Sequence, residues 1–128
     1  MTWIVVGLLG LIGVWVRFAL AQSAVTFWGI STTAMIAGIN VLGSFLIGVL
    51  FSLKQFQVGL SETWVVGLSL GFLGGFTTFS AYSWDTVRLI QNGEMMKGFG
   101  CLVAIPLLSV VSCWIGFQLV KCFFSGGP

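Results

Sequence analysis

The sequence contains no histidine and little charge: five basic and three acidic residues among 128, or 6% of the chain. Soluble domains usually carry about 25% charged residues. Without histidine, zinc sites with histidine ligands, histidine general bases and Ser-His-Asp triads are excluded. So few charges could not cover the surface of a small soluble fold, and the mean hydropathy is +1.11. The composition therefore predicts an integral membrane protein, with the lipid bilayer as its surroundings. We expect it to be a multi-pass protein of the cell (plasma or inner) membrane.

Cysteines are also scarce, and the basic residues form no cluster. Cys101, Cys113 and Cys122 lie in one late apolar stretch without a C-x-x-C spacing, which argues against a disulfide framework or a zinc site. The net charge of +2 comes without a basic cluster, so we expect no nucleic-acid partner. Serines are present, but no base is placed to activate them. We therefore expect no enzymatic activity.

The sequence does have long apolar runs, which the charged residues separate. A membrane-spanning helix needs about 20 apolar residues. Four such runs predict an all-α membrane protein with one domain over residues 1–128, and its helices lie at about 3–21, 34–53, 63–90 and 98–122. Residues 22–33, 55–62 and 91–97 are then loops.

The basic residues give almost no orientation signal. Four spans put Lys54 and Lys121 on one side of the membrane, and Arg17, Arg88 and Lys97 on the other. Two against three is a weak positive-inside bias. Two interpretations stay open: a fixed orientation with a weak signal, or a dual topology in which the chain pairs with an inverted copy.

The third apolar run contains a glycine-threonine stretch where the hydrocarbon should be deepest. Gly74 and Gly75 are poor residues for a helix interior, and Thr77 and Thr78 follow them. This pattern is typical of a membrane helix broken near its middle, here over residues 74–79. Freed carbonyls of such a break can coordinate a cation, and freed N–H groups attract anions. The alternative is a glycine-rich packing face with threonines bonded to their own helix.

Asn40 is a carboxamide inside the second apolar run. A polar side chain at such a depth needs partners. One hypothesis is a hydrogen bond between helices, and the other is an N–H donor directed at a desolvated anion.

The stretch Gly74–Ser80 (GGFTTFS) resembles the GGxTTFS signature of the Fluc (CrcB-type) family of bacterial fluoride channels. Asn40 with Gly43 and Gly48 resembles the NxxGxxxxG pattern of the second helix in that family. Gly10, Gly13 and Arg17 are similar to its first-helix glycines and arginine, and Asp85 falls where the family commonly has a glutamate.

The resemblance implies a passive channel that exports fluoride from the cytoplasm and so gives fluoride resistance. It implies an antiparallel, dual-topology dimer with two pores and a central structural Na⁺, which the backbone carbonyls of Gly74 and Thr77 would hold. Arg17 and Asp85 would be structural or vestibule residues. The implied fluoride pathway comprises Asn40, Thr78, Phe79, Ser80, Tyr82 and Ser109.

The sequence also departs from the family pattern. Tyr82 stands at the second phenylalanine of the usual FSTF motif, and Ala81 stands where a threonine usually lines the path. In the fourth helix Ser109 matches a family serine, whereas Ile105 and Cys101 replace an expected serine and tyrosine.

Because some family members assemble as heterodimers of non-identical subunits, often with one degenerate pore, these departures leave three possibilities. The chain forms a homodimeric channel, or one subunit of a heterodimer, or a non-conducting membrane scaffold. A proton-coupled exporter of the small multidrug-resistance kind is disfavoured, because no acidic residue precedes Glu62.

Overall fold

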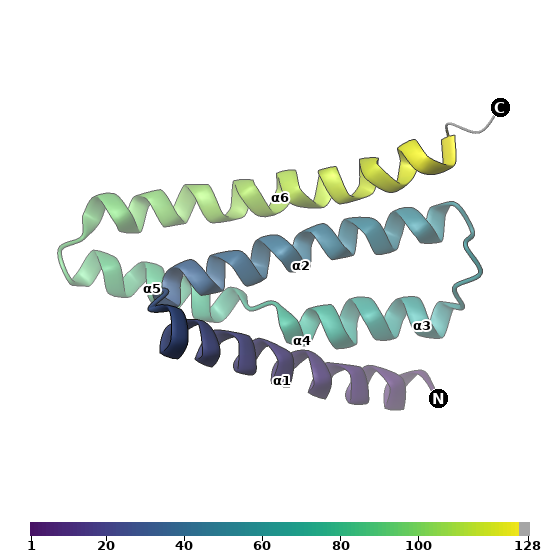
Figure 1. Cartoon of the computed structure of the whole chain (residues 1–128), viewed down its shortest axis with the longest axis horizontal. Coiled ribbons are helices and arrows are strands. Elements are labelled where there is room, and N and C mark those ends of the chain that lie inside the picture. The colour runs from purple at the N-terminus through teal and green to yellow at the C-terminus, as the bar shows by residue number, and fades with distance from the viewer. Residues whose placement is uncertain (126–128) are drawn as a thin grey trace.

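Four apolar helical spans make up the chain (Figure 1), and the computed structural model describes residues 1–125. The first two are α1 (Thr2–Trp28) and α2 (Thr32–Gln55). The third is divided into α3 (Glu62–Val66), the π-helix η1 (Gly67–Leu73), α4 (Gly74–Phe76) and α5 (Phe79–Gln91), and the fourth is α6 (Met95–Ser125). All four are long and apolar enough to cross a membrane. The predicted all-helical architecture with four spans is confirmed.

The first helix is longer than predicted. We expected it to end near residue 21, with a loop over 22–33, but α1 continues to Trp28. Gln22 and Ser23 are two isolated polar residues and do not interrupt the helix. The helix ends at Gly29, which takes the left-handed conformation (φ 63°, ψ 20°) and donates its N–H to the Ala24 carbonyl. Ser31 then caps α2, so the turn between the helices is short.

The third span is broken inside the predicted range, but over fewer residues. Gly74 and Gly75 are helical, and the interruption consists of Thr77 (φ −85°, ψ 158°) and Thr78 (φ −151°, ψ 113°). Gly75 is instead needed for packing on α1, because a Cβ at this position would lie 2.5 Å from the Gly10 carbonyl oxygen. The structure therefore narrows the predicted break at 74–79 to residues 77 and 78.

Helices α2 and α6 pack closely along one another. A Cβ on Gly48 would lie 2.0 Å from the Cys113 carbonyl oxygen, and one on Gly116 would lie 2.3 Å from that of Phe45. Small residues let membrane helices approach in this way. The Ser112 hydroxyl adds a 3.0 Å hydrogen bond from α6 to the Val41 carbonyl of α2.

The N-terminus, the end of α6 and the α2–α3 loop lie at one end of the molecule, and the two remaining turns lie at the other (Figure 1). The Lys54–Glu62 ion pair (2.9 Å) marks the first end. Asp85–Arg88 and Glu94–Lys97 pairs lie around the α5–α6 turn at the second end. Charged side chains are therefore concentrated at the two ends, and Arg17 inside α1 is the exception.

Candidate functional site

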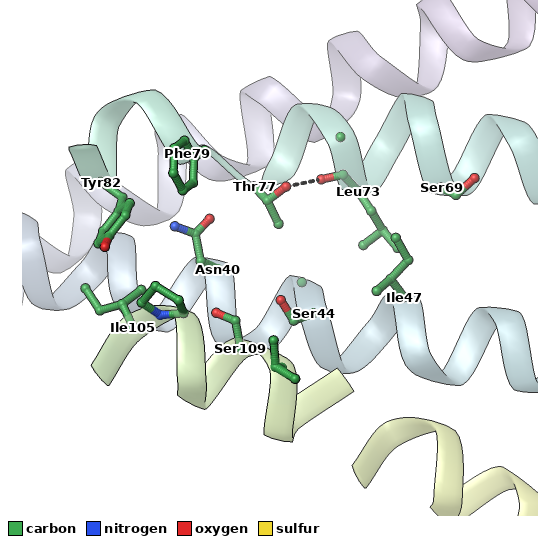
Figure 2. Close-up of a pocket in the computed structure, with 14 residues that line it drawn as sticks. Asn40, Ser44, Ile47, Ser69, Leu73, Thr77, Phe79, Tyr82, Ile105 and Ser109 are labelled. Carbon is green, nitrogen blue, oxygen red and sulfur yellow. Dashed lines mark hydrogen bonds between the residues drawn. The ribbon is translucent and has the colours of Figure 1, made fainter. Parts of the chain in front are cut away.

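A cavity of about 390 Å³ lies between α2, the broken third span and α6. Figure 2 shows its side chains converging from these three elements. Among the residues that the structure describes, its lining contains hydroxyl, amide and apolar groups but no charged side chain. The lining comprises Asn40, Gly43, Ser44, Ile47, Ser69, Leu73, Gly74, Thr77, Phe79, Tyr82, Ile105, Pro106, Ser109 and Val110.

Asn40 joins α2 to the helix break through two hydrogen bonds. Its Oδ1 accepts from the Thr78 backbone N–H at 2.9 Å, and its Nδ2 donates to the Thr78 carbonyl at 3.1 Å. This pairing fixes the orientation of the amide, because only the oxygen can accept from an N–H. The predicted interhelical hydrogen bond is confirmed. An amide nitrogen has two protons, so a second N–H remains, and Figure 2 shows this nitrogen on the side of Phe79 and Tyr82.

The break frees two backbone carbonyls from their helical partners. In a continuous helix the Thr78 N–H would bond the Gly74 carbonyl, but it donates to Asn40 instead. The Ala81 N–H would bond the Thr77 carbonyl, but it donates to the Thr78 hydroxyl at 3.3 Å. Gly74 and Thr77 are the residues whose carbonyls the family resemblance implies as cation ligands.

Arg17 lies against the same break. Its Nε donates to the Gly75 carbonyl at 3.1 Å, and the side chain is half-buried. We expected Arg17 beside the first loop, but the extension of α1 to Trp28 places it well inside the helix. A guanidinium that pairs with a partly buried carbonyl explains how a charge is tolerated at this depth.

The two aromatic residues of the predicted pathway differ in their surroundings. The Phe79 and Tyr82 ring centroids are 5.3 Å apart, with planes inclined by 55°. Phe79 is 76% exposed on the single chain, whereas Tyr82 is 5% exposed. The Tyr82 hydroxyl donates to the Leu102 carbonyl of α6 at 3.1 Å.

The hydroxyl groups divide into two sets. Ser109 lines the cavity as predicted, and Ser44 and Ser69 line it as well, although the sequence analysis did not select them. Ser44 lies one helical turn after Asn40, which is the signal that could have found it. Thr78 and Ser80 do not line the cavity: the Thr78 hydroxyl caps α5 and lies 3.3 Å from the Ser80 hydroxyl.

Asp85 lies outside this cavity. It is 4% exposed, accepts from the Thr33 hydroxyl at 3.1 Å and pairs with Arg88 at 3.0 Å. The bond from Thr33 joins the start of α2 to the middle of α5, and the pair with Arg88 lies within α5. A second cavity, of about 610 Å³, lies nearby and is lined by Arg88, Glu94 and Lys97 among others.

The fold and the site define a multi-pass helical membrane protein whose neutral polar cavity is built around a helix interruption. The family model described as "CrcB-like protein, Camphor Resistance (CrcB)" matches residues 4–117, and the chain belongs to this family.

Among its relatives, a protein of Vibrio parahaemolyticus is 37% identical over 112 residues, covering 87% of both chains. A protein of Vibrio vulnificus is 35% identical, covering 88% of this chain and 89% of the relative. One of Geobacter metallireducens is 31% identical, covering 94% and 98%. All three are named fluoride-specific ion channel FluC, a name for channels and not for enzymes.

Proposed function

We propose that the chain forms a passive, fluoride-selective channel that exports F⁻ from the cytoplasm across the cell membrane and so confers fluoride resistance. The observation that carries this proposal is the uncharged cavity beside the helix break, where the Asn40 amide faces Phe79 and the Ser109 hydroxyl lies across from them. The relatives named fluoride-specific channels support it.

The chemistry of the cavity suits fluoride. The ion is small and strongly hydrated, so donors must replace its water as it enters. Asn40 and Ser109 can donate as neutral groups, which hold an anion less tightly than an arginine would, and conduction needs weak binding at several sites. The edge of the Phe79 ring carries the positive part of its quadrupole.

Export requires no energy source other than the gradients present. Fluoride enters cells as neutral HF in acid media and dissociates inside, so the anion accumulates. A membrane potential contributes about 2.3 kcal/mol per charge per 100 mV, and an interior that is negative drives an anion outward. A passive pore is sufficient.

The pore is completed, in this proposal, by a second subunit in the antiparallel orientation. Gly74, in the short helix α4 just before the break, is exposed on the single chain, and so is Phe79, directly after the break. Irregular backbone at membrane depth is tolerated only where protein buries it or water reaches it. A partner over this face would cover the break, and the nearly equal split of basic residues between the two ends is compatible with inversion.

We also propose a structural Na⁺ at the centre of that dimer. The donor set fits a hard cation, because the Gly74 and Thr77 carbonyls have lost their helical donors to Asn40 and to the Thr78 hydroxyl. Within residues 1–125 no cluster of three or more His, Cys, Asp or Glu side chains could hold a metal, so backbone oxygens are the fitting ligands. When bound, the ion would add a positive field beside an uncharged cavity.

Thermal unfolding tests the cation site independently of transport. The melting temperature of the purified protein should be higher in sodium than in N-methylglucamine, because a ligand bound only to the folded state stabilises it. In Asn40→Leu the Thr78 N–H can return to the Gly74 carbonyl, and the sodium effect should then shrink. An equal sodium effect in both proteins would contradict the assignment.

A heterodimer is the second candidate. Two observations favour it. The Tyr82 hydroxyl already donates to the Leu102 carbonyl and is not free for an anion, and the buried Ile105 stands where the family pattern has a serine. A subunit with such a pore could need a second family member. A non-conducting scaffold is the third candidate, and it predicts no fluoride transport with any partner.

Fluoride efflux from liposomes separates these candidates. With the chain alone, efflux that a fluoride electrode detects should fall strongly in Phe79→Ile. Phe27, 78% exposed and remote from the cavity, provides the matched control: Phe27→Ile should leave efflux unchanged. No efflux with the chain alone, but efflux after a second family member is added, would indicate the heterodimer. No efflux in either case would overturn the proposed channel function.

A further inference from the structure

Tyr82 supplies a hydrogen bond that the backbone of α6 lacks. Pro106 lies inside α6 and has no N–H, so the carbonyl four residues earlier, that of Leu102, has no helical donor. The Tyr82 hydroxyl of α5 donates to this carbonyl at 3.1 Å. A side chain on one helix therefore replaces the missing backbone donor of another, and an unpaired, partly buried carbonyl is avoided.

Tyr82 and Ile105 close one end of the central cavity. They form a buried cluster with Ile36, against which Ala37 and Cys101 pack. Figure 2 shows Tyr82 and Ile105 at the same end of the cavity. Ile105 lines both this cavity and the second one, whose wall includes Ala37 and Cys101. The Tyr82–Ile105 contact is thus a wall between the two cavities, and we call it the closure.

The two spaces on either side of the closure differ in polarity. The central cavity has no charged lining residue among the described residues, whereas Arg88, Glu94 and Lys97 line the second cavity near the α5–α6 turn. An ion that moves from the central cavity toward that end of the molecule meets the closure. A hydrophobic constriction of this kind restricts passage because water and ions leave it.

We propose that Tyr82 and Pro106 form a latch: the Tyr82 hydroxyl, held by the Leu102 carbonyl that Pro106 frees, keeps the closure shut and restrains fluoride passage through this subunit. The proposal rests on the proposed channel function. Tyr82 acts here as a positioning residue, because its hydroxyl bonds the backbone of α6 and its ring maintains the wall. Ile105 supplies the apolar surface on which that ring rests.

A double-mutant comparison tests the latch. Tyr82→Phe keeps the ring and removes only the hydroxyl, whereas Pro106→Ala returns an N–H to the Leu102 carbonyl. Tyr82→Phe alone should lower the melting temperature and raise fluoride efflux about three- to tenfold, the range that corresponds to the loss of one hydrogen bond. In the P106A background, Tyr82→Phe should change neither the melting temperature nor the efflux, because the Leu102 carbonyl then has a backbone N–H donor within α6.

Ser83→Ala is the matched control. It removes a neighbouring hydroxyl of α5 that bonds the Phe79 carbonyl within the same helix, with no bond to α6. It should leave efflux unchanged in both backgrounds.

Two results would overturn the latch: an equal effect of Tyr82→Phe with and without Pro106→Ala, or efflux in Tyr82→Phe that is equal to or below that of the unmodified chain. The thermal comparison needs no transport. If no protein in the set carries fluoride, the proposed function fails, and the melting temperatures alone decide whether the hydroxyl replaces the N–H that proline lacks.

Discussion

Asn40 has two roles that one carboxamide can perform together. Its oxygen and one N–H pair with the backbone of Thr78 and hold the helix break open, and its remaining N–H is left for the cavity. The sequence presented these roles as alternatives. The geometry makes them compatible, because an amide offers one acceptor and two donors.

Asn40→Asp separates the two roles. A carboxylate still accepts from the Thr78 N–H, so the break should persist, but it loses the bond to the Thr78 carbonyl, and the melting temperature should therefore fall. It donates nothing and adds a negative charge beside the cavity, so fluoride efflux should fall by more than about tenfold, because an unscreened like charge repels the ion. Electrode recordings from liposomes measure the fall, and efflux equal to that of the unmodified chain would refute the donor role.

The residues that sequence patterns identified differ in how far their roles could be anticipated. Asn40 was recognisable, because a carboxamide inside an apolar run needs a partner. The Tyr82 hydroxyl was assigned no partner, since its bond to Leu102 depends on how α5 lies against α6. Arg17 was placed too close to a helix end, because isolated polar residues after it gave a false signal of a loop.

At the scale of the element, the broken third span is held open by side chains more than by glycine flexibility. Asn40 and the Thr78 hydroxyl take the N–H groups that would continue the helix, and the Thr77 hydroxyl bonds the Leu73 carbonyl at 2.8 Å. The motif predicted a break in this span, but its position at 77–78 depends on a residue of another helix. A sequence of the third span alone could not supply that information.

Gly43 provides a test of how tightly the break is packed. A Cβ on Gly43 would lie 2.2 Å from Cγ2 of Thr77, whose rotamer is fixed by its bond to Leu73. Gly43→Ala should therefore displace the break, lower stability by about 1–3 kcal/mol and reduce fluoride efflux. Thermal unfolding and electrode recordings measure the two effects.

Gly38, on the same helix, is the control for this substitution. A Cβ there meets nothing within 4 Å, so Gly38→Ala should leave efflux unchanged and hold or raise the melting temperature, since alanine favours a helix. If both substitutions had the same effect, α2 would be sensitive to any added methyl group, and the close packing of Gly43 on the break would not explain the loss.

At the scale of the whole molecule, four spans and their alternation across the membrane followed from the spacing of apolar runs and charges, and the structure agrees. The side on which each end lies did not follow, because two basic residues oppose three. Nor could apolar patterning reveal which outward faces meet lipid and which meet a second subunit. Both surfaces are made of the same kinds of side chain.

Dual topology predicts that each end of the molecule is found on both sides of the membrane. Single cysteines can be placed in a chain without its native cysteines, at Val58 in the α2–α3 loop or at Asn92 in the α5–α6 turn. A thiol reagent that cannot cross the membrane should label both variants partly and to a similar extent in intact cells. Complete labelling of one and none of the other would establish a fixed orientation.

The central claim is that the uncharged cavity at the helix break conducts fluoride selectively, and the reversal potential of the unmodified chain tests it most directly. The protein would be reconstituted in a planar bilayer with a tenfold fluoride gradient and equal chloride on both sides. A fluoride-selective pore should reverse near the fluoride equilibrium potential, about 59 mV from zero for one charge. A current that reverses at zero, at the chloride potential, would contradict the account.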